Sequence, residues 1–157
     1  MTTPAIVTVH GHSSATVEHA FATIAPIDLT LVFRGLGFLP SVVEVRDQTG
    51  AWDHVGATRT AVMSDRSTAD ELITTYVPPL EFGYRVGPMT GLIGKLIDHA
   101  DGAWQFEPTE TGTDITWTYA FMPKTGRGLA VRSCLPLWRR YAEQVLAACI
   151  ERCDKPH

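Results

Sequence analysis

Six runs of residues with a period of two follow one another in the middle of this chain. They cover residues 41–47, 54–63, 68–76, 80–86, 99–108 and 113–122. The breaks between them, such as Gln-Thr-Gly, Ser-Asp-Arg-Ser and Glu-Thr-Gly-Thr, carry residues that favour turns. Because strands joined by short links pair in opposite directions, the pattern predicts an antiparallel sheet.

Another strand and two helical segments precede these runs. Residues 5–12 are rich in β-branched side chains and predict an opening strand. Apolar residues then recur at helical spacing, and Ser13 or Ser14 offers an N-cap for this helix. Asp28 is a candidate cap for a second short helix over 27–33.

The chain ends in an amphipathic helix, and a longer connection interrupts the six runs. The final helix either begins at a Ser133 cap, which puts Pro136 in the first turn, or runs as one kinked helix over 127–152. Residues 87–98 predict a connection with a short helix, and the sequence leaves open whether this connection acts as a lid.

Arg59 is a lone charge on the more apolar face of the run 54–63, which it shares with Val55. If the next turn folds around Asp65, Arg59 lies opposite Glu71, whereas a two-residue loop would put Leu72 there. A solvated cross-strand pair contributes about 0.2–1 kcal/mol. An inward pair is costly unless the interior holds water or a polar ligand. The inward alternative therefore predicts a cavity.

Composition excludes several classes of protein. The 157 residues predict one domain, residues 1–157. A net charge of −4 argues against nucleic acid as a partner. The chain has no transmembrane run and no visible secretory signal, so we expect a cytoplasmic protein. Three cysteines make no disulfide framework, and neither they nor His10 and His12 have a further ligand at metal spacing, so no metal or cofactor is expected.

Four short motifs follow one another in a recognisable order: Gly56-Ala-Thr-Arg59, then Glu71, Tyr84 and Trp117. With the order of elements, they resemble the START-like, or helix-grip (SRPBCC), superfamily and especially its polyketide cyclase/dehydrase-like branch. The resemblance implies an α+β fold in which a curved, antiparallel seven-stranded sheet wraps around a long C-terminal helix. The implied order is one strand, two helices, six strands and the final helix, with a ligand cavity between sheet and helix.

Strand parity and the resemblance together nominate the residues that line this cavity. The expected ligand-binding residues are Arg59, Glu71, Phe82, Tyr84, Trp104, Phe106, Trp117, Tyr119, Trp138 and Tyr141. For each aromatic residue, plain core packing is the alternative. Trp52 is expected at a hairpin tip. The branch also resembles plant hormone receptors of the same fold, but residues 41–47 have no lysine that would tether an acidic ligand, so a carboxylate-bearing hormone is not expected.

We expect a protein that binds a hydrophobic small molecule of lipid, isoprenoid or polyketide type, as a monomer or homodimer. The alternative is a polyketide cyclase, aromatase or dehydratase with Glu71 as base, Arg59 as carbonyl partner and Tyr84 as donor. A salt-bridged Glu71 would be a poor base, because arginine favours the ionised form. A further alternative is an interaction protein that docks on a partner or membrane surface through the apolar segment 35–40, in which case mutations at Leu36 and Phe38 should matter.

Overall fold

The computed structural model describes residues 3–155, which form seven strands and four helices. The strands pair in one antiparallel sheet in the order β1-β7-β6-β5-β4-β3-β2. They are β1 (Ala5–Ser13), β2 (Val42–Arg46), β3 (Thr58–Met63), β4 (Thr68–Val77), β5 (Glu81–Met89), β6 (Ile97–Thr109) and β7 (Gly112–Pro123). The helices are α1 (Val17–Ile24), α2 (Leu29–Val32), α3 (Gly91–Leu96) and α4 (Gly128–Asp154). This confirms the expected α+β helix-grip fold.

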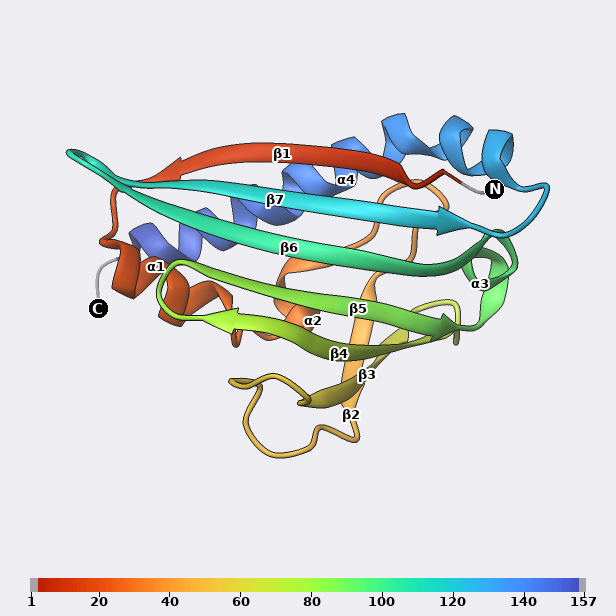
Figure 1. Ribbon diagram of the computed structural model, residues 1–157, viewed down its shortest axis with the longest axis horizontal. Helices are drawn as coiled ribbons and strands as arrows, with labels where there is room; N and C mark the ends of the chain where they lie inside the picture. The colour runs from red at the N-terminus through yellow and green to blue at the C-terminus, as the bar shows by residue number, and fades with distance from the viewer. Residues whose placement is uncertain (1–2, 156–157) are drawn as a thin grey trace.

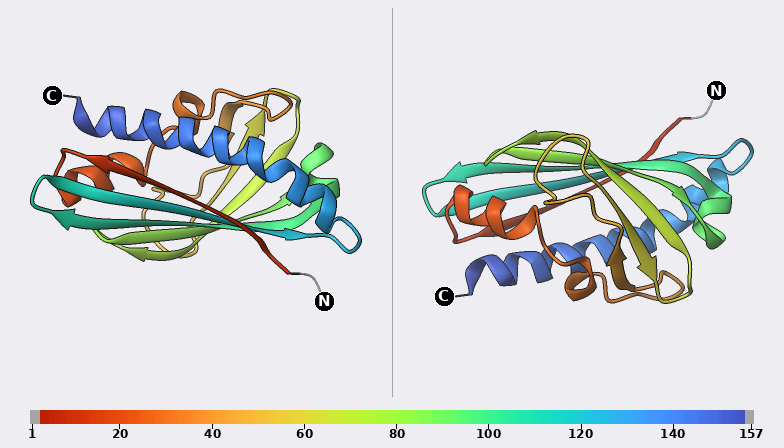
Figure 2. Two further views of the ribbon diagram at one scale, coloured as in Figure 1. Left: turned by 90° about the horizontal axis from the view of Figure 1, so that it is seen from above. Right: turned by 90° about the horizontal axis from the view of Figure 1, so that it is seen from below.

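The sheet curves around α4. In Figures 1 and 2, α4 runs along one side of the sheet, and β2 and β3 turn away from the plane of the other strands toward it. The inward faces of β5, β6 and β7 are aromatic, and α4 covers them with a buried stripe that includes Tyr141, Val145 and Cys149. Most of the core therefore lies between the sheet and this helix.

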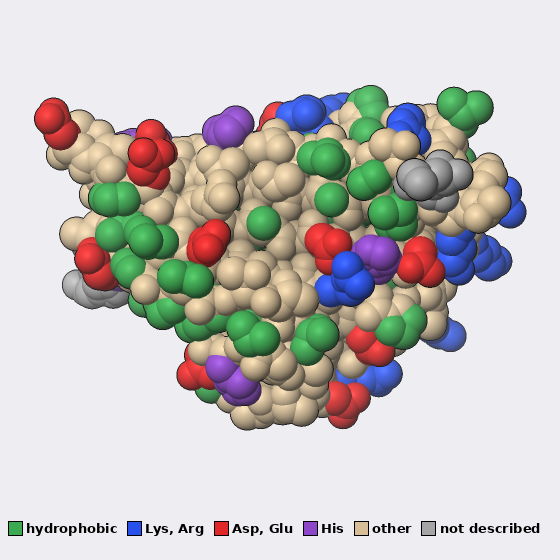
Figure 3. Space-filling view, viewed as in Figure 1, with side chains coloured by type: hydrophobic (Ala, Val, Ile, Leu, Met, Phe, Trp, Pro, Cys, Tyr) green, Lys and Arg blue, Asp and Glu red, His purple; other side chains and the backbone are tan. Residues whose placement is uncertain are grey.

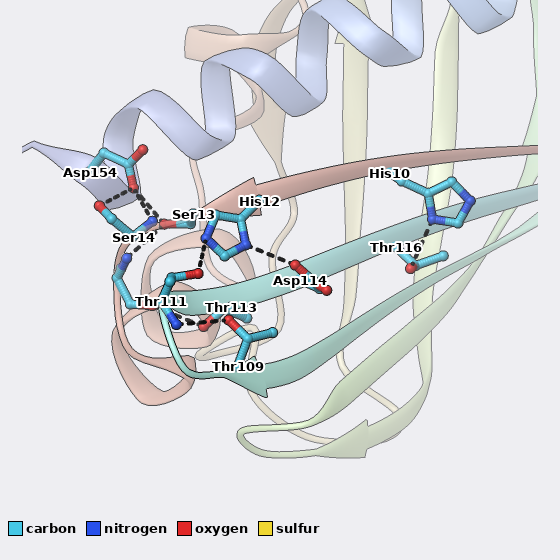
Figure 4. A network of polar contacts seen from close by, with 11 residues as sticks. His10, His12, Ser13, Ser14, Thr109, Thr111, Thr113, Asp114, Thr116 and Asp154 are labelled. Carbon is cyan, nitrogen blue, oxygen red and sulfur yellow. Dashed lines mark hydrogen bonds and ion pairs between the residues drawn. The ribbon is translucent and has the colours of Figure 1, made fainter.

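The N-cap of α1 differs from the prediction, because Ser13 and Ser14 have another role. The side chain of Thr16 caps α1 by accepting a hydrogen bond from the His19 amide. Ser13 is buried and donates from Oγ to Asp154 Oδ1 at 2.5 Å, and the Ser14 amide donates to the same oxygen (Figure 4). These bonds hold the end of α4 against the end of β1. The predicted Asp28 cap of α2 is confirmed.

The final helix is one continuous element, as in the second of its two predicted forms. It runs from Gly128 to Asp154 with Pro136 inside it, so Ser133 is not its cap. Ser133 lies within the helix and donates a hydrogen bond from Oγ to the Ala130 carbonyl at 2.7 Å. Among the described residues, no helix is long and apolar enough to cross a membrane.

The β3–β4 hairpin has the register that places Arg59 opposite Glu71. Asp65 accepts a hydrogen bond from the Ser67 amide in the turn, as expected for a hairpin folded around Asp65. Leu72 lies opposite Thr58, so the alternative two-residue loop was wrong. In this register the inward faces of β3 and β4 each carry one charged side chain, and the two charges meet.

The predicted strand 54–63 is too long at its start. Gly56 has a φ of +95°, a left-handed conformation that interrupts the extended chain, and β3 begins only at Thr58. Val55 is therefore exposed rather than inward-facing. Trp52 lies in the loop of the β2–β3 hairpin, as expected, and its side chain is buried in the core. At the other end of the sheet, β5 and β6 extend into the predicted 87–98 connection, which leaves only the short helix α3.

Candidate functional site

A cavity of about 150 Å³ lies between the sheet and the first half of α4. An apolar cavity of about this size accepts one benzene molecule. Residues from α2, β2, β3, β4, β5, α3, β6, β7 and α4 form the wall. Most of them are apolar, among them Phe33, Leu39, Val42, Met63, Met89, Ile93, Leu96, Val131, Cys134 and Leu135. Thr90 lies in the wall and is exposed, so the cavity reaches the surface beside α3.

Glu71 is the charged residue of this wall, and Arg59 is its partner. Arg59 donates from Nε and from Nη2 to the same oxygen, Glu71 Oε1, at 3.0 and 2.9 Å. The two side chains are 7% and 9% exposed. Removing both charges from water is expensive, and the close pairing offsets much of that cost. Arg59 does not itself line the cavity.

Trp52 holds the guanidinium of Arg59 from its other side. The Cζ atom of Arg59 lies 3.9 Å from the centroid of the indole ring, a cation–π contact that is worth about 2 kcal/mol at desolvated sites. Trp52 thus fixes the position of Arg59, and Arg59 fixes Glu71. The Trp52 Nε1 atom is buried without a hydrogen-bond partner among the described residues.

The second carboxylate oxygen of Glu71, Oε2, accepts no hydrogen bond from the described part of the chain, because both bonds from Arg59 end on Oε1. Although it has no partner in this part of the chain, Oε2 is not fully sealed from solvent. A carboxylate oxygen needs hydrogen-bond donors when it is buried. Glu71 lines the cavity and its Oε1 is bonded to Arg59, so Oε2 is the carboxylate oxygen left to accept a further hydrogen bond.

Two buried tyrosines adjoin Glu71. The Tyr84 hydroxyl accepts a hydrogen bond from Trp117 Nε1 at 3.2 Å. Burial, and then the negative charge of Glu71, raise the pKa of Tyr84 well above its usual value. Burial, followed by Tyr84 and Glu71, likewise raises the pKa of Tyr119. Both phenols therefore stay protonated, and the hydroxyl of Tyr119, which lines the cavity, interacts with that of Tyr84.

Tyr141 connects α4 with the segment that precedes β2. Its hydroxyl donates to the Pro40 carbonyl at 2.9 Å and accepts from the Gly35 amide at 3.0 Å. Gly35 has a φ of +90°, a conformation that favours glycine. These bonds hold Leu39 and Pro40 in the cavity wall. Leu39 is buried, while Phe38 beside it is exposed.

Four of the ten expected ligand-binding residues line the cavity: Glu71, Tyr119, Trp138 and Tyr141. The other six lie behind its wall. Five of them are core aromatics that pack against one another or against Phe21, and Trp104 and Trp117 stack with their ring centroids 4.6 Å apart. These residues outside the wall are Arg59, Phe82, Tyr84, Trp104, Phe106 and Trp117. Strand parity identified the inward face correctly, but most of that face is filled by packed rings.

Several wall residues were missed because they lie in irregular segments. Leu39 and Pro40 belong to the glycine-punctuated segment that was assigned to docking, and Ile93 and Leu96 lie on α3. Parity along a strand gives no information about such residues. The only available signal was the apolar character of both connections.

The histidines at the end of β1 have partners on the neighbouring strand. His12 Nδ1 lies 2.8 Å from Asp114 Oδ1, and its Nε2 lies 3.1 Å from Thr111 Oγ1 (Figure 4). His10 Nδ1 lies 3.2 Å from Thr116 Oγ1. Within residues 3–155, no group of three potential ligands could hold a metal ion.

The chain matches the family model described as polyketide cyclase / dehydrase and lipid transport over residues 4–155. No curated protein matches it. Solved structures with the same fold include Ara h 8.0201, with a TM-score of 0.69 at 13% identity over 96% of this chain and 97% of that one. A protein from Rhizobium leguminosarum has a TM-score of 0.67 at 14% identity over 98% and 96% of the two chains. The di-domain ARO/CYC StfQ from the steffimycin biosynthetic pathway has a TM-score of 0.69 at 15% identity; the match covers 96% of this chain and 51% of StfQ.

Proposed function

We propose that this chain, which belongs to the polyketide cyclase / dehydrase and lipid transport family, binds a hydrophobic small molecule in the cavity between the sheet and α4. The observation that carries the proposal is a buried carboxylate with one unused oxygen in an otherwise apolar wall. The apolar lining removes the body of the ligand from water. Glu71 Oε2 accepts a hydrogen bond from its polar end.

The same carboxylate selects the chemistry of that polar end. A hydroxyl donates to Oε2, whereas a ligand carboxylate would bring a second negative charge against Glu71. Arg59 offsets this repulsion only from behind the wall, because its Nε and Nη2 bonds end on Oε1 and it does not line the cavity. A neutral alcohol or phenol is therefore the favoured ligand class.

Binding of three small probes of similar size tests the proposal. We expect 4-propylphenol to bind more tightly than propylbenzene, and 4-propylbenzoate to bind least, as measured by isothermal titration calorimetry. Glu71→Gln should weaken binding of the phenol about tenfold or more and leave propylbenzene unchanged, because a hydrogen bond to a charged group contributes about 1.5–3 kcal/mol.

Two further variants make this test specific to the cavity. Asp70→Asn removes the same charge from the neighbouring position of β4, where Asp70 is exposed and bonds to Thr60, and should bind all three probes like the original chain. Ala100→Leu places a larger side chain in the wall and should abolish binding of every probe. Equal binding of the phenol by the original chain and by Ala100→Leu would overturn the proposal.

A polyketide cyclase-like reaction in the same cavity is the second candidate, favoured by the presence of a carboxylate and a protonated phenol in one wall. A base must lie within hydrogen-bond reach of the proton that it removes. Among the three catalytic candidates, only Glu71 lines the cavity, whereas Arg59 and Tyr84 lie behind it. Cyclisation of a poly-β-keto thioester that disappears in Glu71→Gln and persists in Asp70→Asn would favour this candidate.

A further inference from the structure

Positive charge gathers at one end of this acidic protein. Between Ile115 and Ala142 the chain has five lysines and arginines and no aspartate or glutamate, although the net charge of the whole chain is −4. Figure 3 shows Lys and Arg side chains at the right-hand end of the molecule, where Figure 1 places α3 and the start of α4. Four exposed residues define this basic end: Lys95, Lys124, Arg127 and Arg132.

The cations of the basic end have few acidic neighbours. None of the four forms an ion pair within residues 3–155. Arg132 donates to the carbonyls of Gly128 and Thr3. Asp98 is the acidic side chain that interacts with Lys124, and its closest partner is His99 at 2.8 Å. The surface therefore presents a net positive field to an external partner.

Two leucines stand out from this basic end into solvent. Leu129, in the first turn of α4, is 87% exposed, and Leu92 on α3 is 56% exposed. The two segments are joined, because the Lys124 amide donates to the Leu96 carbonyl at 2.9 Å. Lys95 lies three residues after Leu92, on the same side of α3. Isolated apolar side chains surrounded by cations match the boundary between the headgroups and acyl chains of an anionic membrane.

The basic end also adjoins the opening of the cavity. Ile93 and Leu96 on α3, and Val131 and Cys134 on α4, line the cavity, so both helices face it with one side and carry an exposed leucine on another. The cavity reaches the surface at Thr90, immediately before α3. If α3 and the start of α4 enter the headgroup layer, the opening of the cavity lies against the lipid.

We propose that the basic end docks on an anionic lipid bilayer, with Leu92 and Leu129 inserted among the headgroups. Lysines and arginines interact with anionic headgroups, and each leucine leaves water for the boundary of the acyl chains. A nucleic acid would use the cations but would give no favourable environment to the leucines. The inference does not depend on which molecule fills the cavity.

Flotation with lipid vesicles tests the docking. The protein should float with vesicles of phosphatidylcholine containing about 30% phosphatidylglycerol, remain behind with pure phosphatidylcholine, and detach in about 0.5 M NaCl. Lys95→Gln/Arg127→Gln should lower the partition coefficient about 25-fold, at about fivefold for each charge removed. Leu129→Ser should lower it about tenfold.

Matched variants at other places separate docking from general effects of charge and hydrophobicity. Arg46→Gln/Lys155→Gln removes two exposed charges outside the basic end, and Leu80→Ser replaces a half-exposed leucine between β4 and β5. Both should partition within about twofold of the original chain, since neither touches the docking surface. The proposal is overturned if the protein fails to float with anionic vesicles, or if these control variants lose as much binding as the test variants. The basic end is a general polyanion surface instead if vesicle binding is lost in Lys95→Gln/Arg127→Gln but not in Leu129→Ser, and if the protein binds duplex DNA tightly.

Discussion

Replacing Arg59 with methionine should strongly destabilise the fold. The change leaves the Glu71 carboxylate, whose side chain is 9% exposed, without the donor of its two short hydrogen bonds. Removing one partner of a buried ion pair costs about 3–5 kcal/mol, because the other charge remains buried and unpaired. For a chain of this length each kcal/mol lowers the midpoint of thermal unfolding by about 2–4 °C, so the expected decrease is roughly 6–20 °C.

The chain provides a matched control in the pair Arg85–Asp101. This pair also joins neighbouring strands with an N–O distance of 2.9 Å, but its side chains are 50% and 46% exposed. When the two variants are compared by urea titration, Arg85→Met should therefore cost only about 0–1 kcal/mol. Arg85 even bonds to both carboxylate oxygens of Asp101, at 2.9 and 3.2 Å, so a smaller cost for Arg85→Met would reflect its exposure and not a poorer contact.

The double variant Arg59→Met/Glu71→Leu tests the physical reason. If the cost of Arg59→Met comes from an unpaired buried carboxylate, removing that carboxylate should restore much of the lost stability, because an apolar pair of similar volume is often as stable as a buried ion pair. The reasoning is refuted if Arg59→Met costs no more than Arg85→Met, or if the double variant is no more stable than Arg59→Met.

Three further predictions concern titration, thiol reactivity and close packing. All four tyrosines have a raised pKa, so above about pH 10 the unfolded chain releases phenolic protons that the folded chain retains. The free energy of unfolding should therefore fall as the pH rises above this value. Absorbance at 295 nm should show delayed ionisation, mainly of Tyr84 and Tyr119. Burial raises the pKa of Cys149 to about 12 and that of Cys153 to about 11, so iodoacetamide at pH 8 should modify Cys134 first. Because Cys134 lines the cavity, 4-propylphenol should protect its thiol. Equal labelling of the three cysteines in peptide mass spectrometry would show that this is wrong. Gly102→Ala would place a Cβ 2.5 Å from Cζ of Tyr84 and should cost about 1–3 kcal/mol, whereas Gly50→Ala, where no atom lies within 4 Å, tests strain without a clash.

The sequence allowed prediction of the sheet, because alternation and turn residues are local signals. It left the β3–β4 register open between a turn around Asp65 and a two-residue loop, and the structure has the first, with Arg59 opposite Glu71. The start of β3 was missed because the positive φ of Gly56 depends on the surrounding structure, not on alternation. The choice between one final helix and a shorter one was likewise settled only by packing along the whole of α4.

The candidate site was predicted only in part, for a different physical reason. Parity shows which side chains point inward, but it cannot show where inward side chains fill the space and where they leave a cavity. Phe82, Trp104 and Phe106 stack closely enough to exclude a ligand, while smaller side chains such as Ala69 and Ala100 leave room at the other end of the sheet. Trp52 could not be anticipated either, because a residue in a loop has no periodicity that would assign it to the core.

A crystal structure of the chain with 4-propylphenol tests the central claim most directly. The account predicts the ring in the cavity between the sheet and α4, with its hydroxyl oxygen about 2.6 Å from Glu71 Oε2, while Arg59 stays bonded to Oε1. The claim is contradicted if the phenol occupies the cavity with its hydroxyl turned away from Glu71, or if it binds elsewhere and leaves the cavity empty.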